Sequence, residues 1–292
     1  MGLADRDYQQ QPSNMRGGGF LSNLPPVVKW LLITNVSIFL FDYLILQLVL
    51  GNWFDPNSGL PRIAFFSAFK ISSAIEGLQL WQFISFQFMH GGLMHVAFNS
   101  VGLFIFGPWM ERWWGPKKFL LFYLISGAGG AAFYSLLFYS GILDGSPHAP
   151  LVGASAGIYG ILIGVAMIAP NMRVQLIFPP IELTMRQLAI LILAIATGTI
   201  FFNLRNAGGE AGHIGGAILG YILMKFPQLL GNGPRISIHP PRAFQSKMQP
   251  RTEINLSDNS EVDAILDKIS NDGFQSLTDE EKEILKKAAN KD

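Results

Sequence analysis

The sequence contains no cysteine, and only 14% of its 292 residues are charged. The absence of cysteine excludes disulfides, thiol nucleophiles, cysteine-ligated zinc and iron–sulfur clusters, so any nucleophile must be an alcohol, a carboxylate or an amine. A soluble chain carries about 25% charged residues, and this chain has too few to coat a surface that faces water. Its formal net charge of +1 is also far below that of nucleic-acid-binding proteins. We therefore exclude a soluble enzyme, a disordered chain and a nucleic-acid binder.

Hydrophobic residues make up 50% of the chain and gather in long stretches. A helix that crosses a bilayer needs roughly 20 apolar residues, because its backbone polar groups must pair within the helix. We therefore predict an all-α, multi-pass membrane domain of six transmembrane helices over residues 28–230. The predicted spans are residues 28–50, 93–111, 117–140, 151–169, 184–203 and 211–230. Residues 1–27 lack the apolar core and cleavage site of a signal peptide, and we expect them to form a flexible cytoplasmic tail.

The distribution of lysine and arginine predicts the orientation of these spans, because cytoplasmic loops of membrane proteins carry an excess of both. With the N-terminus inside, the outer connections hold only Arg62, Lys70 and Arg205 of the 21 basic residues. Both termini are therefore expected in the cytoplasm. The first outer connection, residues 51–92, is rich in aromatic side chains, which we expect at the membrane interface. These are Trp53, Phe54, Phe65, Phe66, Trp81, Phe83, Phe86 and Phe88.

The C-terminal part of the chain is rich in charge and differs from the rest. Residues 231–256 contain proline, glycine and arginine without a period, and we interpret them as a linker. In residues 257–292 an apolar stripe at helical spacing precedes Thr278 and Glu281, which form a capping box for a second helix. The sequence therefore predicts a small cytoplasmic helical hairpin. It is too small to hold much core alone, and we expect it to dock on a partner that the sequence does not identify.

Unusual polar side chains lie near the outer ends of three predicted spans, where polar groups are costly enough to suggest a function. Spans two, four and six all run inward from the outer face, so these side chains should lie at a similar depth. They are His90, His95 and Asn99 of span two, Ser155 and Tyr159 of span four, and His213 of span six. A serine bonded to its own helix would explain Ser155 taken alone. The joint occurrence at one depth favours a functional site.

Glycines at helical spacing mark faces on which two of these spans can approach each other closely. They are Gly153, Gly157, Gly160 and Gly164 of span four, and Gly212, Gly216 and Gly220 of span six. Such faces also serve packing alone. If the two faces meet, however, the hydroxyl of Ser155 and the imidazole of His213 come within hydrogen-bonding reach.

Three motifs in these spans resemble those of the rhomboid family of intramembrane serine proteases: HGGLMHVAFN, GASAGIYG and HIGGAILG. The resemblance covers about residues 28–226 and includes the long first outer loop. It implies a rhomboid-type six-helix bundle in a bacterial plasma membrane, with the active site towards the outer face. It also implies that the substrates are transmembrane segments of other membrane proteins in the lipid bilayer. No cofactor or metal is expected.

The resemblance further implies a serine–histidine dyad without the acidic third member that most serine proteases have. Each role is carried over to the matching position of this sequence. The implied residues are the nucleophile Ser155, the general base His213, the oxyanion-hole residues His95 and Asn99 with the backbone N–H of Ser155, and the supporting residues Tyr159, Gly153 and His90. Tyr159 would pack against the imidazole of His213.

The chain departs from the family pattern at two positions. Ala156 follows the serine where glycine is common, which places a methyl group near the peptide of the oxyanion hole. Gln82 follows Trp81 where arginine is common, and the lost charge would affect loop structure or lipid contact. The acidic residue deep in a span is Asp42, which could orient His213, make a structural hydrogen bond or carry a protonated carboxyl group.

Three other functions remain as alternatives. A catalytically silent rhomboid-like protein that binds transmembrane helices would be expected to lack Ser155 or His213, and both are present. A six-span transporter would show repeated halves or charged residues near the membrane midplane. Zinc hydrolysis through His90, His95 and His213 would need a helical HExxH motif, which the sequence does not contain.

Overall fold

The computed structural model describes residues 22–51, 54–176, 180–231, 262, 264–265, 267–269 and 274–289. The chain divides into two compact units, and the division falls between Pro240 and Pro241 in the sequence. Most of the predicted N-terminal tail lies outside the described residues, as do Trp53, nearly all of the linker and much of the first helix of the predicted hairpin.

The first unit begins with a helical segment that covers the first predicted span. Helix α1 (Pro26–Phe39) continues through the π-helical turns of η1 (Leu40–Ile45) into α2 (Leu46–Leu50). A proline suits the first position of a helix, where no N–H is needed. The carboxylate of Glu111 accepts hydrogen bonds from the backbone N–H groups of Val27 and Val28, at 2.9 and 2.7 Å. The N-terminal amides of α1 are therefore satisfied by a carboxylate, which the helix dipole also favours.

Helix α5 (Leu93–Tyr139) contains both the second and the third predicted spans. The two parts are separated by Gly115, whose φ of 74° and ψ of 165° are not helical. Glycine adopts a positive φ without steric cost, and the proline that follows restricts the residue before it to an extended conformation. The predicted break between residues 111 and 117 is therefore a sharp change of direction and not a loop.

After α5 come the helices α6 (Ser155–Ile168), α7 (Met185–Phe201) and α8 (Ala207–Lys225), and the short turn η4 (Pro227–Leu230) follows α8. Two short strands, β1 (Arg173–Gln175) and β2 (Glu182–Thr184), pair antiparallel between α6 and α7. The all-α prediction did not include them. They form where alternating polar and apolar residues reverse direction, with an Arg173–Glu182 ion pair of 3.3 Å across the strands.

Within the described residues, two helical segments are long and apolar enough to cross a membrane, Pro26–Leu50 and Leu93–Tyr139. Helices α6 and α7 are also apolar but shorter. Helices occupy all six predicted stretches, while the number of membrane crossings stays a prediction.

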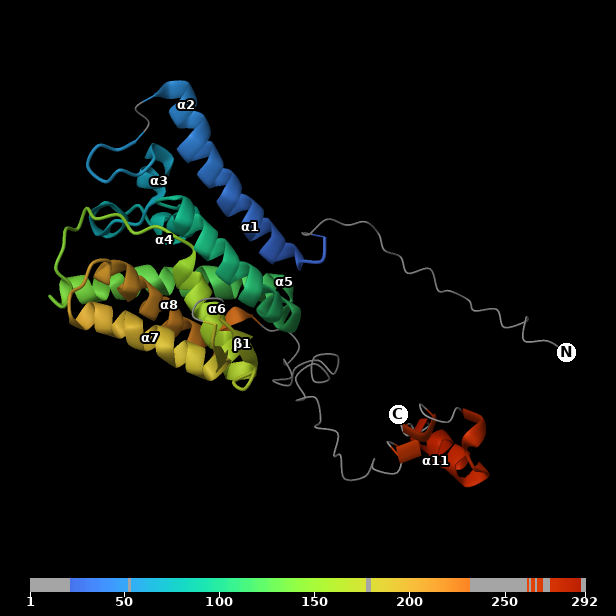
Figure 1. Cartoon of the computed structure of the whole chain (residues 1–292). Helices are drawn as coiled ribbons and strands as arrows, with labels where there is room; N and C mark the ends of the chain where they lie inside the picture. The colour runs from blue at the N-terminus through green and yellow to red at the C-terminus, as the bar shows by residue number, and fades with distance from the viewer. Residues whose placement is uncertain are drawn as a thin grey trace. The chain divides into compact units, whose positions relative to one another are not determined.

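The helices α5, α6, α7 and α8 pack in one bundle, and α1 packs on α5 (Figure 1). The contact between α6 and α8 depends on glycine. A Cβ atom at Gly220 would lie 2.6 Å from the Cα of Gly160, and one at Gly216 would overlap the carbonyl group of Ala156. The two predicted glycine faces therefore meet. Gly157 instead faces Tyr123 of α5, and Gly164 faces both Met110 of α5 and Met224 of α8.

The first outer connection is folded into short helical turns: α3 (Arg62–Ser67), η2 (Ser72–Glu76), α4 (Gln82–Ser85) and η3 (Phe86–Phe88). Its buried centre is Gln82, the residue that replaces the common arginine. The side-chain oxygen of Gln82 accepts from Ser73 Oγ at 2.7 Å, and its amide nitrogen donates to the carbonyl of Phe66 at 3.2 Å. The neutral side-chain amide of Gln82 therefore links two parts of the first outer connection by hydrogen bonds, where the family pattern has a charged arginine.

The aromatic residues of this connection do not all behave as predicted. Phe66 and Trp81 are 66% and 60% exposed, which suits an interface with lipid head groups. Phe86 is instead buried in the core, against Phe69. The nearby Lys70 places its ammonium 3.7 Å from the ring centre of Phe65, and burial lowers the pKa of Lys70.

The second unit contains η5 (Phe274–Ser276) and α11 (Asp279–Ala289), and the described residues between 262 and 269 are helical. The capping box is present. The backbone N–H of Thr278 donates to Glu281 at 2.7 Å, and the N–H of Glu281 donates to Thr278 Oγ1 at 3.3 Å. Lys268 also bonds to the carboxylate of Glu281, at 2.9 Å, and so links the earlier helical residues to α11.

Candidate active site

Ser155 is the first residue of α6, and the segment before it is held by the first outer connection. Leu151 forms a β-bridge with Phe69, with two backbone hydrogen bonds of 2.8 and 3.0 Å. The N–H of Gly153 donates to the carbonyl of Phe86 at 2.9 Å. Gly153 has a φ of 121°, which glycine adopts readily. The chain therefore turns into α6 at a fixed place and presents Ser155 at a helix N-terminus.

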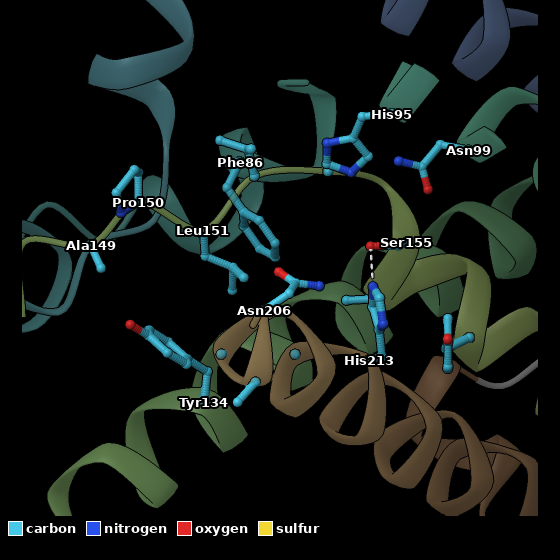
Figure 2. Close-up of a pocket in the computed structure, with 18 of the residues that line it drawn as sticks. Phe86, His95, Asn99, Tyr134, Ala149, Pro150, Leu151, Ser155, Asn206 and His213 are labelled. Carbon is cyan, nitrogen blue, oxygen red and sulfur yellow. Dashed lines mark hydrogen bonds between the residues drawn. The ribbon is translucent and has the colours of Figure 1, made fainter. Parts of the chain in front are cut away.

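His213 lies in the second turn of α8 and reaches Ser155 across the α6–α8 contact (Figure 2). The distance between His213 Nε2 and Ser155 Oγ is 2.7 Å. Tyr159, one turn after Ser155, stacks on the imidazole with ring centres 4.2 Å apart and an interplanar angle of 14°. The glycine contact thus brings an alcohol, an imidazole and a phenol ring together.

The second nitrogen of the same imidazole also has a partner. His213 Nδ1 lies 2.9 Å from Oε2 of Glu210, and the two side chains are 17% and 18% exposed. The sequence prediction missed Glu210, because the sixth span was taken to begin at residue 211. The signal was present as an acidic residue three positions before a histidine, a spacing that puts both on one helix face.

Asp42, considered from the sequence as a possible orienter of His213, has a structural role instead. Its carboxylate accepts from the backbone N–H groups of Ile63 at 3.2 Å and Ala64 at 2.7 Å. These are N-terminal amides of α3, which have no partner within their own helix. Asp42 therefore holds the first outer connection against the first helical segment.

His95 and Asn99 of α5 approach the Ser155 side of the pocket (Figure 2). A Cβ atom at Gly153 would lie 2.6 Å from His95 Nε2 and 3.5 Å from Asn99 Nδ2, so the glycine leaves room for both. Asn99 is buried, and its Nδ2 makes no hydrogen bond with the described residues. His90 is also buried, and its ring meets that of His95 edge-on at 5.2 Å.

One pocket of about 740 Å³ is lined by His95, Asn99, Ser155, Tyr159 and His213. Figure 2 shows Phe86, Leu151, Tyr134 and Asn206 on its other walls. Asn203 and Asn206, before α8, both have positive φ, and Asn203 donates to the Asp144 carboxylate at 2.8 Å. The pocket combines apolar walls with a few polar groups, which is typical of ligand-binding and active sites.

Ala156, the other departure from the family pattern, fits without displacing Ser155. A Cβ atom at Gly130 of α5 would lie 2.6 Å from the Ala156 Cβ, so the methyl group occupies space that Gly130 leaves. Ala156 is 3% exposed. The methyl group of Ala156 is therefore accommodated in the packing contact between α6 and α5.

The fold and this pocket define a helical membrane protein with a serine–histidine pair. Residues 77–226, about half of the chain, match the Rhomboid domain family. The chain therefore belongs to the rhomboid family, whose members include intramembrane serine proteases. Residues 255–291 match a second family, described as a family of unknown function (DUF6576), so the C-terminal unit is a separate module.

The relatives of the chain include proteins that are named rhomboid proteases. The chain is 28% identical to AarA of Providencia stuartii over 66% of this chain and 69% of that protein. It is 29% identical to GluP of Bacillus subtilis over 63% of this chain but 33% of that protein. It is 26% identical to GlpG of Haemophilus influenzae over 49% of this chain and 68% of that protein. The chain thus spans about two thirds of AarA and GlpG but only a third of GluP.

Proposed function

We propose that the chain is an intramembrane serine endopeptidase that cleaves transmembrane segments of other membrane proteins. The observation that carries the proposal is the 2.7 Å contact between Ser155 Oγ and His213 Nε2 inside a polar pocket. A serine alcohol is a weak nucleophile until a positioned base takes its proton. His213 is at the right distance to act as that base.

The reaction proceeds in two halves. In the first, Ser155 Oγ attacks the scissile carbonyl carbon while its proton passes to His213 Nε2. The C–N bond then breaks, and His213 returns the proton to the leaving amine, which leaves an acyl group on Ser155. In the second half, water attacks the acyl carbon and gives a proton to His213. The proton returns to Ser155 as the new carboxyl terminus departs.

The negative charge of each tetrahedral intermediate needs donors, especially in an apolar environment. The backbone N–H of Ser155 is one of the N-terminal amides of α6 that have no partner within the helix, and the helix dipole favours an anion there. The side chain of Asn99 places on the same pocket a buried N–H₂ group that has no hydrogen-bond partner among the described residues. With His95, these groups support the proposed oxyanion hole, and Tyr159, Gly153 and His90 support its geometry.

We place the protein in a bacterial plasma membrane, with six spans, both termini in the cytoplasm and the site towards the outer face. The low charge, the basic residues on the inner connections and the bacterial relatives support this topology. The lipid bilayer and transmembrane substrates are the partners of the membrane domain. The C-terminal module is proposed to bind a cytoplasmic partner.

The test is cleavage of a model transmembrane substrate by the purified full-length protein in detergent and in liposomes. We expect wild-type cleavage, and loss of both cleavage and fluorophosphonate labelling in Ser155→Ala. His213→Ala should lose cleavage as well. Ser140→Ala is the matched control, because its exposed hydroxyl only bonds to the Leu137 carbonyl of its own helix. Cleavage that persists in Ser155→Ala, or binding of the substrate without cleavage by the wild type, would overturn the proposal.

A further inference from the structure

We infer that Glu210 is a positioning residue for His213, so that the site works as a Ser155–His213–Glu210 triad. This inference rests on the proposed function. The imidazole is held at both nitrogens, with Nε2 at 2.7 Å from Ser155 Oγ and Nδ1 at 2.9 Å from Glu210 Oε2. The two contacts lie on opposite edges of the ring, which is the arrangement that a base and its orienting acid require.

The contact with Glu210 selects one form of the neutral imidazole. An ionised carboxylate can only accept hydrogen bonds, so the proton of the ring must lie on Nδ1. Nε2 is then left as an acceptor for the hydroxyl proton of Ser155. With the opposite form, Nε2 would carry the proton and could not act as the base.

The position of Glu210 is fixed by the start of α8. Glu210 lies in the first turn of this helix, where the helix dipole favours a carboxylate. The three-residue spacing places it one turn before His213 on the same face. The amide of Asn206 lies beside Glu210, and the absence of a side chain at Gly209 leaves room for that amide. The start of α8 therefore places the carboxylate next to Nδ1 of His213.

The same carboxylate stabilises the charge that forms during the reaction. When His213 takes the serine proton it becomes an imidazolium, with Glu210 within 2.9 Å of its Nδ1. The two side chains are less than one-fifth exposed, so solvent screens their attraction weakly. Stacking on Tyr159 holds the plane of the ring but supplies no negative charge. Glu210 therefore has a role that Tyr159 cannot replace.

The experiment compares Glu210→Gln and Glu210→Ala with the wild type, using cleavage of a model transmembrane substrate by the full-length protein. We expect kcat to fall by about 10- to 100-fold, the range for losing one charge-assisted hydrogen bond, with little change in KM. Glu182→Gln is the control, because it removes an exposed carboxylate of the β1–β2 hairpin that only pairs with Arg173. Thermal unfolding of each variant reports folding separately.

The split between kcat and KM distinguishes positioning from a structural role. The groups that face His213 are Glu210 on α8, His95 on α5 and Tyr159 on α6, and Asp144 lines the same pocket. Glu210→Gln keeps the shape of the side chain but removes its charge, so it should lower kcat while KM and the thermal unfolding temperature stay unchanged. A folded Glu210→Gln with wild-type kcat would overturn the inference.

A measurement on the wild type keeps the test independent of variant folding. Nitrogen-15 NMR of labelled histidines, with the His213 signal assigned from a His213→Gln sample, should show the proton on Nδ1 in the neutral ring. A proton on Nε2 would overturn the inference. If Ser155→Ala also retains cleavage, the proposed function fails. If Ser155→Ala is inactive while Glu210→Gln behaves as wild type, only the role of Glu210 fails.

Discussion

Replacing Gly220 by alanine tests whether the approach of α6 and α8 sets the geometry of the active site. A Cβ atom at Gly220 would lie 2.6 Å from the Cα of Gly160, whereas two carbon atoms in contact lie about 3.6 Å apart. The helices must therefore separate by roughly 1 Å at this level. Gly220 lies two turns after His213 on the same helix, so the displacement is expected to reach the imidazole.

A shift of this size is large compared with the tolerance of the site. The contact between Ser155 Oγ and His213 Nε2 is 2.7 Å, and lengthening it by about 1 Å exceeds hydrogen-bonding distance. Misplacement of reacting groups by about 1 Å can lower a rate by about 100-fold. Overpacking a close helix contact should also cost about 1–3 kcal/mol of stability. We expect both effects in Gly220→Ala.

The assay is kcat for cleavage of a model transmembrane substrate, with thermal unfolding measured on the same preparation. Gly198→Ala in α7 is the matched control, since a Cβ atom there meets nothing within 4 Å. It should keep wild-type kcat and wild-type or slightly higher stability, because alanine is the better helix former. Wild-type kcat in a folded Gly220→Ala would refute the reasoning, since the site would then tolerate separation of the helices.

Three further predictions concern the oxyanion hole, a helix cap and the C-terminal module. Asn99→Ala should lower kcat by about 100- to 1,000-fold with a smaller change in KM, as steady-state cleavage would measure, because it removes a proposed oxyanion donor. Glu111→Ala should lower the thermal unfolding temperature, with a loss of about 1 kcal/mol, because it removes the cap of α1. In α11, the bond from the Thr278 backbone holds the pKa of Glu281 below its ordinary value. This stabilisation is present at neutral pH and is lost as the pH falls through the lowered pKa, which amide hydrogen exchange of α11 in the full-length protein should detect.

Each of these predictions has a result that would contradict it. A larger effect of Asn99→Ala on KM than on kcat would assign the side chain to substrate binding. Equal unfolding temperatures for Glu111→Ala and wild type would show that solvent caps α1 equally well. For the C-terminal module, Glu281→Gln is the control and should lose the pH dependence of exchange. The same pH dependence in Glu281→Gln would place its origin in another group.

Much of the helical arrangement could be predicted because it follows from local patterns. Stretches of apolar residues marked the positions of the helices, and glycine spacing marked where α6 and α8 approach. The contact of Ser155 with His213 followed from these two patterns together. Gly115 shows the limit of this reasoning, since the sequence predicted an interruption but not its geometry, which depends on a single positive φ.

The features that the sequence did not predict depend on the exact ends of helices and on contacts between residues far apart in the chain. Glu210 was missed because the helix begins one turn before the apolar stretch does, and apolar composition cannot locate a polar first turn. Asp42 was ambiguous because its partners, the amides of α3, lie more than twenty residues away in the chain. The burial of Gln82 was equally hidden, since a hydrogen-bonded amide has no periodic signature.

The cap that Glu111 provides for α1 has a consequence for how the protein is made. The carboxylate and the amides that it satisfies are 83 and 84 residues apart. During synthesis the leading amides of the first helical segment have no such acceptor until the chain has been made as far as Glu111. The first segment therefore gains this cap only together with the second, and the two complete the helix end as a pair.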